Sequence, residues 1–252
     1  KMISAPRLWG EWIALLCGQY VEHVLTDFLE IIAVIIPNIN KMKDFDQCHP
    51  THCYDVWQHT IRVVGKVLPY PELRLAALFH DIGKPSTFTK DHKGVGHFYG
   101  HARVSAIIAE VELERLGCPR QMKESVVRLV KGHGVLLSEE ERLIKRRLNQ
   151  WGPRLYFMLI NLKKADVLAQ SPEVSSRVYQ LEKIKNITRQ IITQGDCFNI
   201  STLEIDGRDL MDLGIPEGPL IGHWLRFILK KVIDGEVKNE REELIRFIKK
   251  TC

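Results

Sequence analysis

The sequence of 252 residues contains few cysteines and no long apolar run, and each shortage argues against a class of protein. Its six cysteines form no C-x-x-C pair and no framework spacing, so a disulfide scaffold and a thiolate zinc site are disfavoured, and we expect reduced thiols in a cytoplasmic protein. The longest uninterrupted apolar stretch covers residues 31–36, far below the roughly 20 residues that cross a bilayer. We therefore expect no membrane partner.

Glycine and proline are also sparse, at 17 and 11 residues, and neither sign of charge dominates. This composition excludes collagen-like and disordered chains. Lys and Arg outnumber Asp and Glu by 36 to 31, which gives a net charge of +5 and permits a nucleic-acid partner without requiring one. With 45% hydrophobic residues the chain can bury a sizeable core, and its length predicts one or two domains at roughly 150 residues each.

Helical periodicity is the strongest local pattern that the sequence contains. Apolar residues at helical spacing predict two helices over residues 6–36, and a proline ends the second. Between residues 54 and 166, amphipathic segments are separated by short Gly and Pro turns, and no strand-like alternation occurs. We predict an all-α fold in three parts: an N-terminal helical segment packed on the bundle (1–50), a helical bundle (51–200) and a small C-terminal helical unit (201–252).

A short basic run, residues 145–147, follows a serine and a glutamate that have the spacing of a capping box. Ser138 and Glu141 predict the start of a short helix. The basic run then lies at the other end of that helix, where it complements the macrodipole on a solvated face. Contact with nucleic acid is the alternative interpretation of these three charges.

Several of the ten histidines continue the apolar face of a predicted helix. His59 falls on the stripe of Val56 and Val63, so its imidazole is expected to point inward. Five further side chains are predicted to point inward in the same way, which gives a set of six residues: His59, His80, Asp81, His101, His133 and Asp166. Two buried carboxylates beside four imidazoles are compensated most simply by a bound cation, and mutual hydrogen bonds in the core are the alternative. Neutral imidazole with carboxylate suits Mn, Ni, Co, Fe or Mg.

The strings around these residues resemble a known family. Residues 79–84 read FHDIGK, and adjacent His and Asp at a helix end are similar to the HD superfamily of metal-dependent phosphohydrolases. Other strings resemble the HD and C-terminal regions of the bacterial tRNA nucleotidyltransferase and poly(A) polymerase family: YDVWQHT (54–60), LRLAALFHDIGKP (73–85), HFYGH (97–101), DGRDLM (206–211), LGIPEGP (213–219) and GEVKNE (235–240). The resemblance extends over most of the chain and implies an HD-domain helical bundle.

The resemblance implies a metal centre with one or two divalent ions. It assigns as ligands of the first metal His59, His80, Asp81 and Asp166. In family members with two metal ions, one aspartate bridges the two ions and two further histidines hold the second ion. The resemblance assigns these roles to Asp81 and to His101 and His133. Contact with a substrate phosphate is the alternative for His101. We expect His97, four residues before His101, to share its helix face and to bind substrate, as an alternative ligand or as an acid.

These residues support hydrolysis at phosphorus. A metal lowers the pKa of bound water toward neutrality, and Asp81 is the first candidate to orient or deprotonate that water. Lys84 and Arg103 are predicted to clamp phosphate oxygens as catalytic and substrate-binding residues, and a solvated loop lysine is the alternative for Lys84. The loop over residues 87–96 has the polar and glycine content of a mobile lid.

One part of the family that the chain resembles is absent, namely the nucleotidyltransferase head with its Gly-Ser motif and paired carboxylates. The chain is therefore interpreted either as a stand-alone HD protein or as the C-terminal part of a longer enzyme. We expect a phosphohydrolase that acts on a nucleotide or an RNA 3′ end, including a 2′,3′-cyclic phosphate. The alternatives are the tRNA-binding C-terminal part of a CCA-adding nucleotidyltransferase and a non-catalytic HD protein that binds a nucleotide.

The C-terminal segment contains a second candidate site for phosphate. Gly218 and Pro219 predict a helix start, where unpaired backbone amides attract an anion. Arg226, Lys230 and Lys231 follow on the same predicted helix. The resemblance implies a tail that binds tRNA, and a plain packing turn is the alternative.

Overall fold

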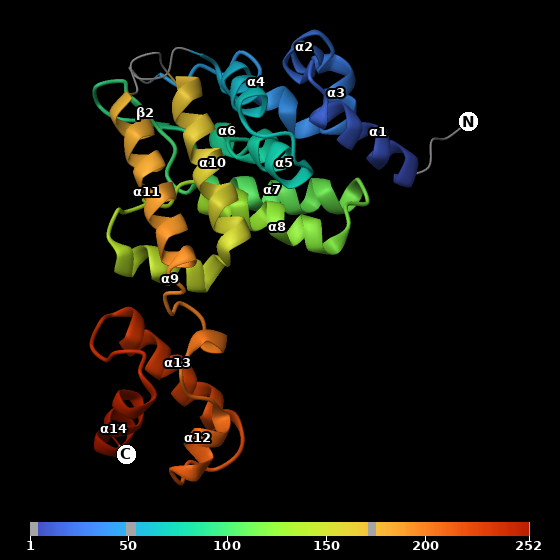
Figure 1. Cartoon of the computed structure of the whole chain (residues 1–252). Helices are drawn as coiled ribbons and strands as arrows, with labels where there is room; N and C mark the ends of the chain where they lie inside the picture. The colour runs from blue at the N-terminus through green and yellow to red at the C-terminus, as the bar shows by residue number, and fades with distance from the viewer. Residues whose placement is uncertain (1–4, 49–53, 171–174, 252) are drawn as a thin grey trace. The chain divides into compact units, whose positions relative to one another are not determined.

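The computed structural model describes residues 5–48, 54–170 and 175–251, and the regular secondary structure of this part of the chain is almost entirely helical (Figure 1). The α-helices are α1 (Ala5–Cys17), α2 (Val21–Asp27), α3 (Leu29–Ile35), α4 (Val56–Lys66), α5 (Pro71–Phe79), α6 (Lys84–Thr87), α7 (His101–Arg115), α8 (Arg120–Gly132), α9 (Glu141–Trp151), α10 (Pro153–Gln170), α11 (Ser175–Thr193), α12 (Gly207–Asp212), α13 (Pro219–Ile233) and α14 (Arg241–Thr251). The remaining elements are two 3₁₀ helices, η1 (Pro37–Lys41) and η2 (Ile200–Thr202), and two strands, β1 (Thr89–Lys90) and β2 (Gly96–His97). The all-α prediction is confirmed. None of the helices in the described ranges combines the length and the apolar character that crossing a bilayer requires.

The chain forms two compact units. The first consists of Lys1–Leu136 with Phe157–Leu181, and the second of Leu137–Tyr156 with Glu182–Cys252. These units do not follow the predicted boundaries at residues 50 and 200. Helices α1 and α2 pack on α5 and α4, in agreement with the prediction of an N-terminal segment packed on the bundle, whereas α9 packs on α13 and belongs to the second unit. Each unit therefore combines stretches that are separate in sequence.

Three helices, not the predicted two, form the N-terminal region. Phe28 separates α2 from α3 because its backbone, at φ −114° and ψ 27°, leaves the helical conformation. Leu25 and Ile32 are buried on the two sides of this break. The apolar periodicity therefore continues through the break and conceals it in the sequence.

Helix α5 forms the centre of the first unit. It contacts α1, α4, α7 and α8, and every residue from Leu73 to Phe79 is buried. A helix surrounded in this way has almost no exposed face, which explains why its residues from Leu73 to Phe79 are all apolar except the buried Arg74. Asp55 caps the neighbouring α4, because its carboxylate accepts a hydrogen bond from the backbone N–H of Gln58 at 2.6 Å.

The turn after α5 is pressed against α7, and glycine is required there. A Cβ on Gly83 would lie 2.6 Å from the backbone nitrogen of Ser105 and 2.8 Å from the carbonyl oxygen of His101. The Gly83 N–H donates instead to Ser105 Oγ at 2.9 Å. Close contact between the turn and α7 thus brings the residues around His80 next to the start of α7.

The segment predicted as a mobile lid contains a short antiparallel hairpin. Thr89 pairs with His97 and Lys90 with Gly96. Asp91 orders the turn, because its carboxylate accepts hydrogen bonds from the backbone N–H groups of residues 93 and 95, both at 2.9 Å. The lid function itself remains a prediction.

Helices α12, α13 and α14 share the core of the second unit. Buried residues of this core are Ile205, Leu210, Ile215, Ile228, Leu244 and Ile248. Helix α12 begins with a reciprocal capping box, in which the side chains of Asp206 and Asp209 each accept a hydrogen bond from the other's backbone N–H. The predicted helix start at Pro219 is present, and it follows Gly218 at a φ of 133°.

Helix α9 begins at Glu141, but the predicted capping box is wrong. No side chain caps this helix, and Ser138 Oγ accepts a hydrogen bond from the N–H of Glu140 at 3.2 Å instead. The helix also continues past residues 145–147, so the basic run lies in its middle and the macrodipole interpretation is wrong. Two of these three basic side chains form ion pairs with aspartates of the same unit.

Candidate metal centre

Four histidines and two aspartates of the first unit come together from segments far apart in the sequence. His59 lies on α4, His80 and Asp81 follow α5, His101 begins α7, His133 follows α8 and Asp166 lies on α10. The structure thus brings together all six residues that the sequence nominated as metal ligands. Their role as ligands remains a proposal, which the geometry below supports.

The first group surrounds one carboxylate oxygen of Asp81. Oδ2 of Asp81 lies 3.2 Å from His80 Nε2 and 3.6 Å from His59 Nε2, and the two imidazole nitrogens are 3.4 Å apart. Asp166 Oδ1 lies 3.1 Å from His59 Nε2. His59, His80 and Asp81 at this spacing form a donor set that divalent transition metals bind, and Asp166 lies beside it.

The second group surrounds the other oxygen of the same carboxylate. Asp81 Oδ1 lies 3.4 Å from His101 Nε2 and 3.6 Å from His133 Nε2. These two nitrogens are only 3.0 Å apart. Asp81 therefore faces both groups, which is the position expected of a carboxylate that bridges two metal ions.

Hydrogen bonds outside the cluster orient three of the imidazoles. Nδ1 of His80, His101 and His133 lies 2.7, 2.8 and 2.6 Å from the backbone carbonyl oxygen three residues earlier. A carbonyl oxygen only accepts, so each Nδ1 donates, and in the neutral ring Nε2 carries a lone pair. These lone pairs face Asp81 and one another. A buried cluster of acceptors of this kind fits a cation, and imidazole ligands of metals commonly donate from the other ring nitrogen in this way.

Lys84 forms a buried ion pair with the Asp81 carboxylate. Its Nζ lies 2.7 Å from Asp81 Oδ2 and donates to Gln47 Oε1 at 2.8 Å, and the side chain is buried. Burial raises the pKa of Asp81, but His80, whenever its ring is protonated, and Lys84 outweigh it and hold that pKa well below its ordinary value. The interpretation of Lys84 as a solvated loop lysine is therefore wrong, and Asp81 stays ionised.

One side of the cluster opens into a cavity of about 380 Å³. The side chains of His101 and Asp166 are 23% and 20% exposed there, whereas the other four are buried. Lys163 and Arg177 add positive charge to the cavity wall. Burial lowers the pKa of Lys163, against the opposing effect of Asp166, and its Nζ donates to the carbonyl oxygen of His133 at 2.6 Å.

Lys163 and Arg177 are site residues that the sequence analysis missed. Lys163 precedes Asp166 by three residues on α10, so helical periodicity offered a signal for it. Arg177 approaches from α11, and no local pattern in the sequence links it to the cluster. Both belong to the first unit, so the cavity lies within one compact body.

Two predicted substrate-binding residues have different surroundings from those expected. His97 lies on β2 and not on the helix of His101, because α7 begins only after Gly100, whose φ of 76° suits glycine. His97 still lines the cavity, where its Nε2 lies 3.1 Å from Asp91 Oδ2. Arg103 is exposed and does not line the cavity. It lies two positions after His101 on α7, and at this spacing the two side chains point in different directions.

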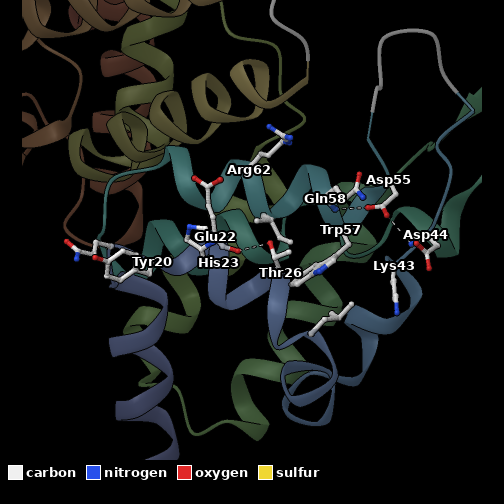
Figure 2. Close-up of a pocket in the computed structure, with 13 residues that line it drawn as sticks. Tyr20, Glu22, His23, Thr26, Lys43, Asp44, Asp55, Trp57, Gln58 and Arg62 are labelled. Carbon is white, nitrogen blue, oxygen red and sulfur yellow. Dashed lines mark hydrogen bonds between the residues drawn. The ribbon is translucent and has the colours of Figure 1, made fainter.

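Figure 2 shows a second cavity of the first unit, of about 780 Å³, which shares no lining residue with the metal centre. Side chains of both charge signs line it, and Trp57 forms part of its wall. The carboxylate of Asp55 in this cavity accepts hydrogen bonds from the backbone N–H groups of Asp44 and Gln58. No group of three metal-ligating side chains gathers in this cavity within the described ranges.

The chain matches the family described as tRNA nucleotidyltransferase domain 2 over residues 97–248. It is 30% identical over 230 residues to the CC-adding tRNA nucleotidyltransferase of Thermus thermophilus, covering 86% of this chain and 50% of that protein. It is 29% identical over 198 residues to the A-adding tRNA nucleotidyltransferase of Deinococcus radiodurans, with 76% and 45% covered. A multifunctional CCA protein of Aromatoleum aromaticum is 24% identical over 196 residues, with 71% and 47% covered. The chain thus spans about half the length of these curated relatives.

Proposed function

Because this chain belongs to the tRNA nucleotidyltransferase domain 2 family, we propose that it is the tRNA-binding part of a CC-, A- or CCA-adding nucleotidyltransferase. The family match carries this proposal, since it runs from β2 through both compact units into α14. The excess of basic residues agrees with a polyanionic partner.

Binding of tRNA to the full chain tests this function directly. Fluorescence anisotropy with a labelled tRNA should show tighter binding than with an unstructured RNA of equal length. The affinity should fall as salt rises, because phosphate contacts release counterions. Equal affinity for both RNAs would contradict a tRNA-specific role.

The geometry of the His–Asp cluster favours a second function, a metal-dependent phosphohydrolase. Two ligand groups share Asp81 at the base of a cavity whose wall carries Lys163 and Arg177. The cavity volume suits a nucleotide and excludes a folded RNA, so the proposed substrate is a terminal phosphate of RNA or a free nucleotide, including a 2′,3′-cyclic phosphate. A bound divalent ion supplies Lewis acidity toward a phosphoryl oxygen and acidifies water at the site.

The side chains of the centre have separate roles in this proposal. Asp81 serves as the shared ligand and not as the proton acceptor, because a carboxylate with a strongly lowered pKa is a weak base. Lys84, which also donates a hydrogen bond to Gln47, holds that carboxylate in place. Lys163 and Arg177 offer donors to nonbridging phosphate oxygens, the role that the sequence analysis gave to Arg103.

Turnover of bis(p-nitrophenyl) phosphate and of 2′,3′-cyclic nucleotides tests the hydrolase. The full chain should hydrolyse at least one of these with Mn, Ni, Co, Fe or Mg, and Asp81→Asn should abolish the activity while circular dichroism retains the helical signal. Lys231→Ala, outside the first unit, is the matched control and should keep full turnover. Hydrolysis by Asp81→Asn at the wild-type rate, or none by the wild type with any metal, would refute this function.

A further inference from the structure

A cleft of about 530 Å³ lies within the second unit, apart from the metal centre, and two basic residues of the candidate phosphate site suggested by the sequence, Arg226 and Lys230, line it. Two helices and η2 form it, and both η2 and α9 contact α13. The lining residues are Arg146 and Asn149 from α9, Ile200 from η2, and Arg226, Leu229, Lys230 and Ile233 from α13. All of them belong to one compact body, so the shape of the cleft does not depend on how the two units are arranged.

The floor and the rim of this cleft differ in chemistry. Leu229 and Ile233 are 3% and 7% exposed and form the floor, where Ile200 adds an apolar side chain that is 37% exposed. Arg226 and Lys230 are exposed on the rim, and their spacing of four residues places them on one face of α13. An apolar floor beside adjacent cations matches a nucleoside that carries a phosphate.

The charge of the rim is only partly neutralised. Arg146 contacts Asp234 at 2.6 Å, so one of the three rim cations has an acidic partner. Arg226 and Lys230 form no ion pair with any residue in the described ranges. Lys231, the next residue, does not line the cleft and pairs with Glu236 at 2.6 Å. The structure therefore separates the three cations that looked equivalent in the sequence.

We propose that this α9–α13 cleft binds one nucleotide of an RNA backbone. Arg226 and Lys230 contact its flanking phosphates, and Ile200, Leu229 and Ile233 contact the base or ribose. Asn149 offers an amide donor and acceptor beside them. This inference rests on the proposed tRNA-binding function and names the place on the second unit where the RNA is held.

The experiment measures tRNA affinity of the full chain against salt concentration. Each phosphate contact contributes about 0.7–0.9 to the slope of log affinity against log salt, so the double variant Arg226→Ala, Lys230→Ala should flatten that slope by about 1.4–1.8. Lys230→Ala alone should flatten the slope by about 0.7–0.9, whereas Lys231→Ala, which also removes one charge but lies outside the cleft, should change it far less. Ile200→Ser should lower the affinity by roughly fivefold, the effect of losing about 40 Å² of apolar contact, and leave the slope unchanged.

The possible outcomes separate this inference from the function on which it rests. If the wild type binds tRNA and the double variant keeps its slope, the cleft is not an RNA site, although the tRNA-binding function stands. If the wild type binds no tRNA, both proposals are wrong. If Lys230→Ala and Lys231→Ala flatten the slope equally, the charge of α13 acts without the cleft, and the inference is overturned.

Discussion

Divalent metal should stabilise this chain, and replacement of one carboxylate should remove the effect. In the absence of metal, the Nε2 lone pairs of His101 and His133 face each other at 3.0 Å beside the shared carboxylate of Asp81. A cation that binds only the folded chain shifts unfolding by mass action, by about 2.7 kcal/mol at a metal concentration 100-fold above its Kd. For a protein of this size each kcal/mol raises Tm by about 2–4 °C. The expected rise in Tm is therefore about 5–11 °C.

Thermal unfolding after chelator treatment, with and without added Mn, Ni, Co, Fe or Mg, measures this shift. Elemental analysis of the reloaded protein should give two ions for the wild type. Asp81→Asn removes the ligand common to both groups and should abolish the shift, whereas His133→Asn should leave one ion. His223→Asn changes an exposed imidazole of the second unit and serves as the matched control.

Either of two results would contradict the interpretation that two groups of ligands, joined by Asp81, each bind a metal ion. The first is a wild type whose Tm no metal raises and which retains under about 0.1 ion per chain. The second is an Asp81→Asn variant with the full shift of the wild type. A His133→Asn variant that still binds two ions would place the second ion elsewhere.

Three further outcomes follow from the structure. Gly83→Ala should destabilise the fold by about 1–3 kcal/mol in urea unfolding, because its Cβ would meet the backbone of Ser105 at 2.6 Å; an unchanged midpoint contradicts this. Lys84→Met should cost about 3–5 kcal/mol in chelated protein, because it leaves Asp81 buried without its cation; stability equal to the wild type would show that the contact is dispensable. The backbone N–H at the start of α12 lowers the pKa of Asp209, despite some burial, so its stabilising effect is complete above about pH 4 and is lost as pH falls below that value. Asp209→Asn should therefore lower Tm at pH 7 and much less at pH 3, and an equal decrease at both pH values contradicts this assignment.

Helical periodicity was enough to predict much of the fold and of the candidate ligand set. It works because 3.6 residues per turn decide which side chains share a face, whatever that face contacts. His59 among the valines of α4 and Asp166 on α10 were found in this way. The same rule concealed the break at Phe28, because one non-helical residue leaves the apolar pattern on both sides intact.

The errors among the site residues have a common physical cause. His97 and His101 are four residues apart, but the prediction of a shared face required a helix that starts before Gly100. Arg103 lies on that helix, on a side that does not reach the cavity. Where a helix begins and how it is rotated against its neighbours are decided by packing, so a spacing in the sequence does not determine them.

The sequence alone determined which residues are chemically able to form a metal centre and that they lie on the inward faces of helices or directly after them. The resemblance implied the shared position of Asp81, but only the tertiary structure decided that Lys84 is buried against it and that Arg177 reaches the cavity. It likewise separated Lys230, on the rim of the cleft, from its paired neighbour Lys231. The physical reason is that periodicity reports only on residues within a few turns of the same helix, whereas these contacts depend on how distant segments of the chain pack together.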